Sequence, residues 1–182
     1  MTTPTPPADE DFAPLSFRQR TARIAALVVI LLIAAMWGWA FFATPRGLPG
    51  ALDNRSFPDA AEPICTKAAE QIAALPLAFT TTDHVARAGV IAQANSYLSD
   101  MLDQLDQVVP SEPADESASI KEWLGDWRVY VSDRTNYAQR LQTDPEARFY
   151  VTAKDRRQIT QPIDFFAKAN LIYNCQVPSD IE

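Results

Sequence analysis

The stretch RQRTARIAALVVILLIAAMWGWAFFATPRG, residues 18–47, decides the organisation of this 182-residue chain. Within it, residues 24–43 form a run of 20 without a charged side chain or a proline. As an α-helix, such a run is roughly 30 Å long at about 1.5 Å per residue, which matches the hydrocarbon core of a bilayer. The sequence therefore predicts a transmembrane helix over residues 24–43.

A cleaved secretory signal is the main alternative for this segment, and a buried helix of a soluble protein is a third. Signal peptides have a shorter apolar core, about 7–15 residues, before a small-x-small cleavage site. Residues 38–40, Gly-Trp-Ala, imitate such a site. Trp37, Trp39, Phe41 and Phe42 instead fit an aromatic belt at the membrane interface. Together with the length, these aromatic residues favour an uncleaved anchor.

Flanking arginines predict the orientation of the span in the plasma membrane. Three arginines directly precede the apolar run, Arg18, Arg20 and Arg23. Two follow it, Arg46 and Arg55, and these lie further apart in the sequence. Because basic residues concentrate on the cytoplasmic side, we expect a cytoplasmic N-terminus and an extracytoplasmic C-terminal domain.

The rest of the chain divides by composition. Residues 1–23 are rich in Pro, Thr and acidic residues, so they predict a disordered cytoplasmic tail. Residues 44–58 predict a linker, and residues 59–182 are enough for one small domain with its own core. After the span, the chain contains 13 basic and 20 acidic residues, which gives a net charge of −7. This acidic balance argues against nucleic acid or anionic lipid headgroups as the main partner.

Beyond the linker, apolar residues recur at alternating steps of three and four, which is typical of amphipathic helices. The helices predicted in this way cover residues 59–75, 82–108 and 119–141. A fourth helix, residues 162–175, is apolar on almost all sides, which is typical of a buried helix. A capping box, Ser119 with Glu122, predicts the start of the third helix. The β-prone residues 149–152, with a turn at 154–155, predict a short hairpin or arm before the fourth. The fold class is therefore mainly α, with an antiparallel four-helix bundle after the transmembrane helix.

The chain contains two cysteines, Cys65 and Cys175. In a domain that faces an oxidising compartment, a pair of cysteines favours a disulfide over a metal site. In an up-down-up-down bundle, the start of the first helix lies beside the end of the fourth, which is where these cysteines fall. We therefore predict one intramolecular Cys65–Cys175 disulfide.

Two polar residues interrupt the apolar stripes. Arg134 falls on the stripe of the third helix and Asn170 on that of the fourth. A buried guanidinium must be paired and hydrogen-bonded. One interpretation is a structural network that joins Arg134 to Asp133, to Asn170 or to a carboxylate of another helix. The other is a pocket for an anionic ligand, with Trp127 and Tyr130 beside it.

Motifs for chemistry are sparse in this domain. After the linker the only glycines are Gly89 and Gly125, so a glycine-rich phosphate loop and a nucleophile elbow are excluded. No metal or cofactor is expected. The carboxylates Glu122, Asp126 and Asp133 would suit acid–base work of the glycosidase kind, although ordinary surface charge accounts for them more simply.

Two segments, WLGDWRVYVSDRTNYAQRL (residues 123–141) and IDFFAKANLIYNC (residues 163–175), together with the overall layout, carry a resemblance. The chain resembles uncharacterised single-pass membrane proteins predicted in actinobacteria. The resemblance implies no activity and no residue roles.

The leading hypothesis is a membrane-anchored, extracytoplasmic helical accessory or interaction protein that is not an enzyme. Its partners would be the membrane and another membrane or cell-envelope protein, with no nucleic acid. The alternative is a sensor-like helical bundle that binds a ligand near Arg134 and Asn170. A carboxylate-based cell-envelope enzyme fits least well.

Overall fold

The computed structural model describes residues 17–42 and 50–181. The chain divides into two units, Met1–Arg46 and Gly47–Glu182. Most of the predicted cytoplasmic tail, the last residue of the predicted span and the first part of the predicted linker lie outside the described residues.

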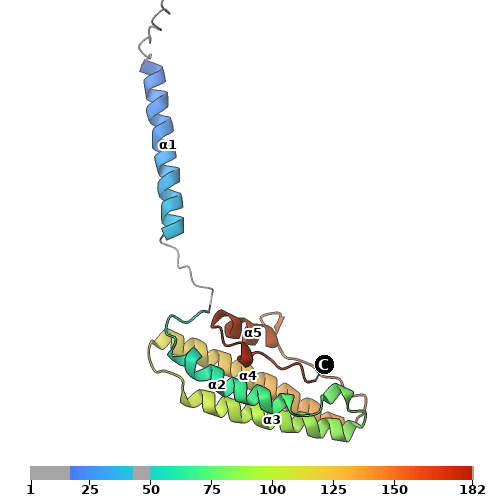
Figure 1. The fold of residues 1–182 in the computed structure, drawn as a ribbon. Coiled ribbons are helices and arrows are strands. Elements are labelled where there is room, and N and C mark those ends of the chain that lie inside the picture. The colour runs from blue at the N-terminus through green and yellow to red at the C-terminus, as the bar shows by residue number, and fades with distance from the viewer. Residues whose placement is uncertain (1–16, 43–49, 182) are drawn as a thin grey trace, which may run out of the picture. The chain divides into compact units, whose positions relative to one another are not determined.

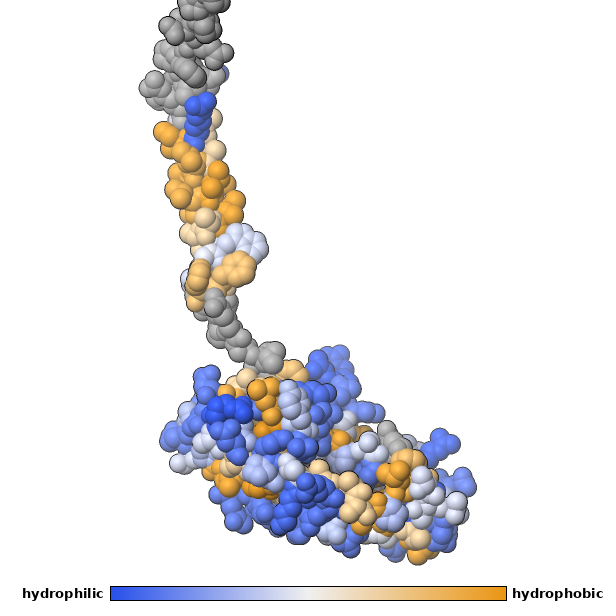
Figure 2. Space-filling model, in the orientation of Figure 1, coloured by the Kyte–Doolittle hydropathy of each residue, from blue (hydrophilic) through white to orange (hydrophobic). Residues whose placement is uncertain are grey.

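The described residues of the first unit form the helix α1, Phe17–Phe42. Its portion Thr21–Phe42 is long and apolar enough to cross a membrane, a property that it shares with signal sequences near an N-terminus. Its large apolar side chains are exposed within the unit, and in Figure 2 hydrophobic (orange) residues cover much of the helix. The predicted N-terminal apolar helix is therefore confirmed.

The second unit is built mainly from helices, as predicted. Its α-helices are α2 Ser56–Ala73, α3 His84–Gln107, α4 Ala114–Leu141 and α5 Thr160–Ala169, with the short 3-10 helices η1 Ala78–Thr80 and η2 Tyr173–Cys175. Helix α3 packs along both α2 and α4, whereas α5 packs on α4 and η2 on α2 (Figure 1). Helices α3 and α4 run antiparallel, because the start of α3 contacts the end of α4 through His84 and Leu141 while Asp106 pairs with Arg128 at the other end.

Side chains from all these helices form the core. Its largest cluster joins residues of α2, α3, α4 and α5 to Ile172 and Cys175. Most residues of the predicted stripes are buried, whereas Leu75, Val108 and Val131 are partly buried. The buried ones are Ala61, Cys65, Ala68, Ile72, Ile91, Ala94, Leu98, Met101, Leu105, Ile120, Leu124, Trp127, Arg134, Ala138 and Leu141. The predicted Cys65–Cys175 disulfide is confirmed, and it joins residues 110 positions apart.

A short antiparallel hairpin precedes α5. Its strands are β1 Ala153–Lys154 and β2 Arg157–Gln158, and the first residue of β1 lies opposite the last of β2. Asp155 and Arg156 form the turn with φ of 51° and 63°, the left-handed conformations that a two-residue type I′ turn requires. A small hairpin at this place is confirmed, but the β-prone residues 149–152 lie outside its strands.

Helix α2 begins at Ser56, so the predicted linker over residues 44–58 extends too far. Phe57 is buried, and its ring lies edge-on to that of Trp123 with 6.1 Å between centroids. Pro58 sits in the first turn, where a missing N–H breaks no helical hydrogen bond. Burial of Phe57 explains why the ordered unit starts earlier than the 3-4 pattern indicates.

Helix α4 begins at Ala114, so the predicted capping box is wrong and Ser119 lies inside the helix. Pro113 directly precedes the first turn, which contains Asp115 and Glu116. These carboxylates are favourable near the positive end of the helix dipole. Residues 114–118, which the sequence places before the third helix, therefore belong to α4.

Helix α5 ends at Ala169, several residues before the predicted end near residue 175. The N–H of Ile172 donates to the carbonyl of Ala167 at 3.0 Å, and that of Leu171 to Lys168 at 3.2 Å. Together with φ of 60° at Leu171, these bonds form a Schellman motif. Glycine is the usual residue at this left-handed position, so a leucine there hides the helix end.

Candidate functional site

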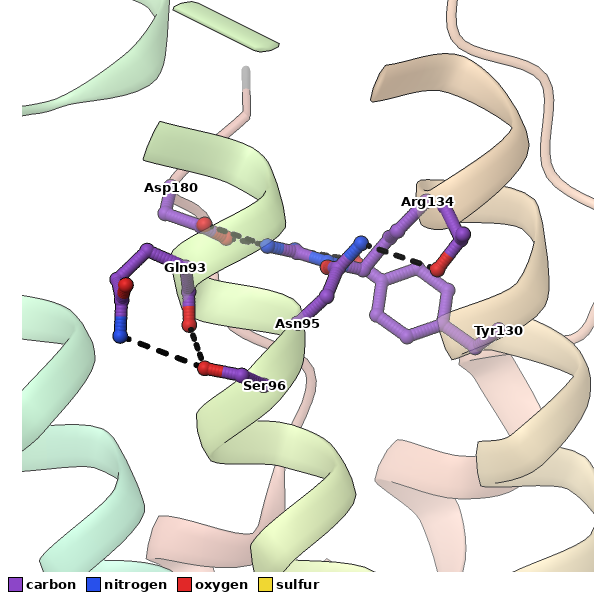
Figure 3. Close-up of polar contacts among 7 residues, drawn as sticks. Gln93, Asn95, Ser96, Tyr130, Arg134 and Asp180 are labelled. Atoms are coloured by element: carbon purple, nitrogen blue, oxygen red, sulfur yellow. Dashed lines mark hydrogen bonds and ion pairs between the residues drawn. The ribbon is translucent and has the colours of Figure 1, made fainter. Parts of the chain in front are cut away.

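Arg134 of α4 lies at the centre of a buried ionic network. Its side chain is 0% exposed. Its Nη1 and Nη2 donate to Oδ1 and Oδ2 of Asp180 at 2.7 and 2.6 Å, and its Nε donates to Oδ1 of Asn95 at 2.6 Å. Figure 3 shows these residues converging from α4, α3 and the C-terminal segment. The network thus fastens the C-terminal segment to two long helices.

Tyr130 completes the surroundings of the guanidinium one helical turn away. Nη1 of Arg134 donates to the Tyr130 hydroxyl at 3.4 Å, and the guanidinium carbon lies 5.6 Å from the ring centroid. Burial acts to lower the pKa of Arg134, but the hydrogen bond with Asp180 and the charge of that carboxylate raise it above the ordinary value. Arg134 is therefore a permanent cation that requires a carboxylate partner.

The sequence does not identify the partners of Arg134 correctly. Asp133 instead accepts from the N–H and hydroxyl of Thr152, at 2.7 and 2.9 Å. The carboxylate on Arg134 comes from Asp180, in an irregular segment that no periodic pattern reaches. The burial of Asn95 could have been predicted from the sequence, because Asn95 falls four residues after Ile91 and three before Leu98, on the apolar stripe of α3.

Asn170 belongs to a different network. Its amide nitrogen donates to the carbonyls of Gly50 and Phe166 at 3.0 and 2.9 Å, and its Oδ1 accepts from the N–H of Leu52 at 2.8 Å. Arg55 donates to the Asn170 carbonyl at 2.8 Å. These contacts tie residues 50–55 to the end of α5. Among the hydrogen bonds of the described residues, Arg134 and Asn170 have no common partner.

The two aromatic candidates belong to the core. Trp127 is buried, and its ring lies edge-on to those of Trp123 and Tyr130 at 6.5 and 5.9 Å between centroids. Tyr130 therefore contacts both Arg134 and Trp127, whereas Asn170 belongs to a separate network.

A groove with a volume of about 590 Å³ lies between α4, the β1–β2 hairpin and α5. It is lined by Gly50, Ser119, Glu122, Trp123, Asp126, Lys154, Asp155, Arg157, Gln161, Pro162, Phe165 and Phe166. The buried rings of Trp123 and Phe166 stack with centroids 4.9 Å apart. Phe165 beside them is 51% exposed. This exposure corrects the expectation that the fourth helix is buried all round.

Lys154 links the hairpin to α4 at the edge of the groove. Its Nζ donates to Oε1 of Glu122 at 2.7 Å and to both carboxylate oxygens of Asp126 at 2.8 and 3.0 Å. The hydrogen bond to Asp126, followed by that to Glu122, raises the pKa of Lys154 above its ordinary value. Lys154 is therefore an ammonium at neutral pH, and it holds together two carboxylates that the sequence singled out for acid–base chemistry.

The groove therefore offers aromatic surface bordered by charges of both signs. Asp155 and Arg157 lie on the hairpin side, and the Glu122 side chain on the α4 side is 68% exposed. Such a surface suits an apolar side chain with polar or charged neighbours. Within residues 17–42 and 50–181, no group of three or more His, Cys, Asp or Glu side chains is placed to hold a metal ion.

Comparison with known proteins found no relative. The chain matches no protein-family model, no curated protein and no solved structure. Function is therefore inferred from the residues and contacts of this chain.

Proposed function

We propose that this protein is a membrane-anchored, extracytoplasmic helical accessory protein that acts by binding another membrane or cell-envelope protein. The observation that carries the proposal is the groove between α4, the hairpin and α5, with its half-exposed Phe165. In this proposal the second unit is an antiparallel four-helix bundle in which α5 and η2 together supply the fourth element.

Two further observations support an anchor and an outward-facing domain. Helix α1 meets the length and composition of a membrane span, and Arg18 and Arg23 stand at its N-terminal end. By the positive-inside rule, these arginines favour a cytoplasmic N-terminus. The Cys65–Cys175 disulfide favours an oxidising compartment for the second unit. The charge pattern and the redox chemistry thus agree on one orientation.

The groove has the composition of a protein-binding surface. Interfaces are centred on aromatic side chains within a polar rim, and a few such residues carry most of the binding energy. Phe165 supplies the accessible aromatic ring, and Glu122 and Asp155 supply acidic groups at the rim. We expect the partner to place an apolar side chain against Phe165 and a basic side chain near these carboxylates.

Site-specific photocrosslinking tests this proposal in the native membrane. Benzoylphenylalanine in place of Phe165 is expected to give a discrete crosslinked species that contains a second membrane or cell-envelope protein. The matched control replaces Phe79 of η1, which is 48% exposed and lies outside the groove lining. It is expected to give no such species.

Charge reversal at Glu122→Lys is expected to reduce the crosslink from position 165 at least tenfold, because the rim then repels the basic side chain of the partner and the hairpin loses the pair between Glu122 and Lys154. Two results contradict the proposal. One is the absence of a specific adduct at position 165, and the other is the same set of adducts at positions 165 and 79.

A further inference from the structure

Residues 176–181, here called the C-terminal strap, follow the disulfide-bonded Cys175 and cross the second unit without forming a helix or a strand. Besides the bonds that Gln176 donates to the carbonyl of Tyr173, three polar contacts hold the strap within the described residues. The N–H of Val177 donates to Oδ1 of Asp164 at 2.9 Å, and the N–H of Ala78 donates to the carbonyl of Asp180 at 3.2 Å. The third contact is the bidentate ion pair between Asp180 and Arg134. The strap is therefore held at its two ends.

The strap does not fill the surface along which it runs. A cavity of about 210 Å³ lies beside it, lined on the strap side by Val177, Pro178, Ser179 and Ile181. On the other side it is lined by Tyr130, Phe149 and Val151, among others. Five of the six strap residues are partly buried, and Ser179 is exposed. The surface under the strap thus has room for bulkier side chains than those of the strap itself.

The same surface has a strict chemical requirement at one point. Arg134 is fully buried and charged, so a carboxylate must approach it with both oxygens. Asp180 of the strap supplies both oxygens, whereas Asn95 accepts only from the Nε–H. Asp180 therefore stands in the position of a bound anionic ligand.

We propose that the surface under the strap is a binding site for an extended acidic peptide segment of another protein, and that the strap occupies this site in cis as a displaceable internal ligand. Arg134 binds the carboxylate of the segment. Ala78 donates to the main-chain carbonyl of that same acidic residue, and Asp164 accepts the main-chain N–H three residues before it. This site is distinct from the groove that contains Phe165, and the inference does not depend on the proposed function.

The position of the strap makes exchange feasible. An irregular segment with few hydrogen bonds opens at a lower free-energy cost than the helices along which it lies. The Cys65–Cys175 disulfide keeps η2 on α2 while the residues beyond it detach. A tethered strap has an effective concentration of about millimolar, so it excludes weaker or more dilute peptides. Only a peptide segment with a higher affinity for the site than weak competitors have would therefore displace the strap.

A binding measurement on the full chain in mild detergent tests the site. The probe is a fluorescent peptide of sequence QVPSDI, identical to residues 176–181, and its partner probe has Asn in place of Asp. A chain that ends at Cys175 is expected to bind the Asp peptide at least tenfold more tightly than the Asn peptide. The intact chain is expected to bind the Asp peptide at least tenfold more weakly than the shortened chain does.

A second variant covers the case in which the shortened chain does not fold. Full-length Asp180→Asn keeps the strap but weakens its ion pair, so it is expected to bind the Asp peptide at least threefold more tightly than the wild type. Ser179→Ala, an exposed strap position, is the matched control and is expected to bind as the wild type does.

If the shortened chain folds but shows no saturable binding of the Asp peptide, the proposal is overturned and the strap is only a structural segment. Equal affinity for the Asp and Asn peptides also overturns it, because Arg134 then does not select the carboxylate. If the shortened chain is unfolded, Asp180→Asn decides. If Asp180→Asn binds the Asp peptide no more tightly than the wild type does, the proposed site is rejected.

Discussion

Arg134→Ala is expected to lower the free energy of unfolding by about 3–5 kcal/mol, the usual cost of removing one partner of a buried ion pair. The substitution leaves the Asp180 carboxylate, whose side chain is only 11% exposed, without its cation. It also removes a side chain that fills the space between α3, α4 and the C-terminal strap. In thermal unfolding, a loss of this size corresponds to a decrease in Tm of about 10–20 °C for a domain of this length.

Arg128→Ala is the matched control for this prediction. Arg128 lies on the same helix and pairs with Asp106, but their side chains are 50% and 43% exposed. Such a surface pair contributes at most about 1 kcal/mol, so Tm should fall by only a few degrees. Equal decreases in the two variants would show that Arg134 is not held in a buried network.

Removal of the disulfide is expected to have an effect of similar size. The Cys65–Cys175 bridge closes a loop of 110 residues, and the loss of that restraint from the unfolded chain costs roughly 4–5 kcal/mol. A domain of this kind has a total stability of about 5–15 kcal/mol. The double variant Cys65→Ala/Cys175→Ala should therefore be close to the limit of folding at 37 °C.

Chemical unfolding with and without reductant measures this effect. Reductant should bring the wild type close to the double variant and should leave the double variant unchanged. Equal stability of the wild type in the two conditions would mean that the bridge does not stabilise the fold.

Much of the helical organisation follows from the sequence, because buried stripes repeat with the helical period. The stripes of the first three predicted helices identified mostly buried residues, including the charged Arg134, although Leu75, Val108 and Val131 are only partly buried. The two cysteines were predicted to pair because both fall where the first and last helices meet. Patterns of this kind are read within one helix, so they predict burial well.

The places where prediction failed depend on contacts between distant segments. The early start of α2 depends on the packing of Phe57 against Trp123. The end of α5 depends on Leu171 in a left-handed conformation that a leucine seldom adopts. Asp180 was missed because an irregular segment has no period that would align it with Arg134.

The groove could not be predicted from the sequence for a related reason. Its lining comes from three elements, and the hairpin that forms one side is fixed by Lys154 reaching the carboxylates of Glu122 and Asp126. The fourth helix appears apolar on all sides, which predicts complete burial. Because that helix is short and packs mainly on α4, Phe165 is left at the surface.

The proposed function requires that the disulfide-bonded domain be outside the cytoplasm and attached to an uncleaved span. Protease treatment of intact cells or spheroplasts, with one tag at each end of the chain, tests both requirements. We expect the C-terminal tag to be lost while the N-terminal tag persists on a short fragment that contains α1. Before digestion, both tags should lie on one chain of full length. A protected C-terminal tag, or an N-terminal tag already separated from the domain, would contradict the proposed arrangement.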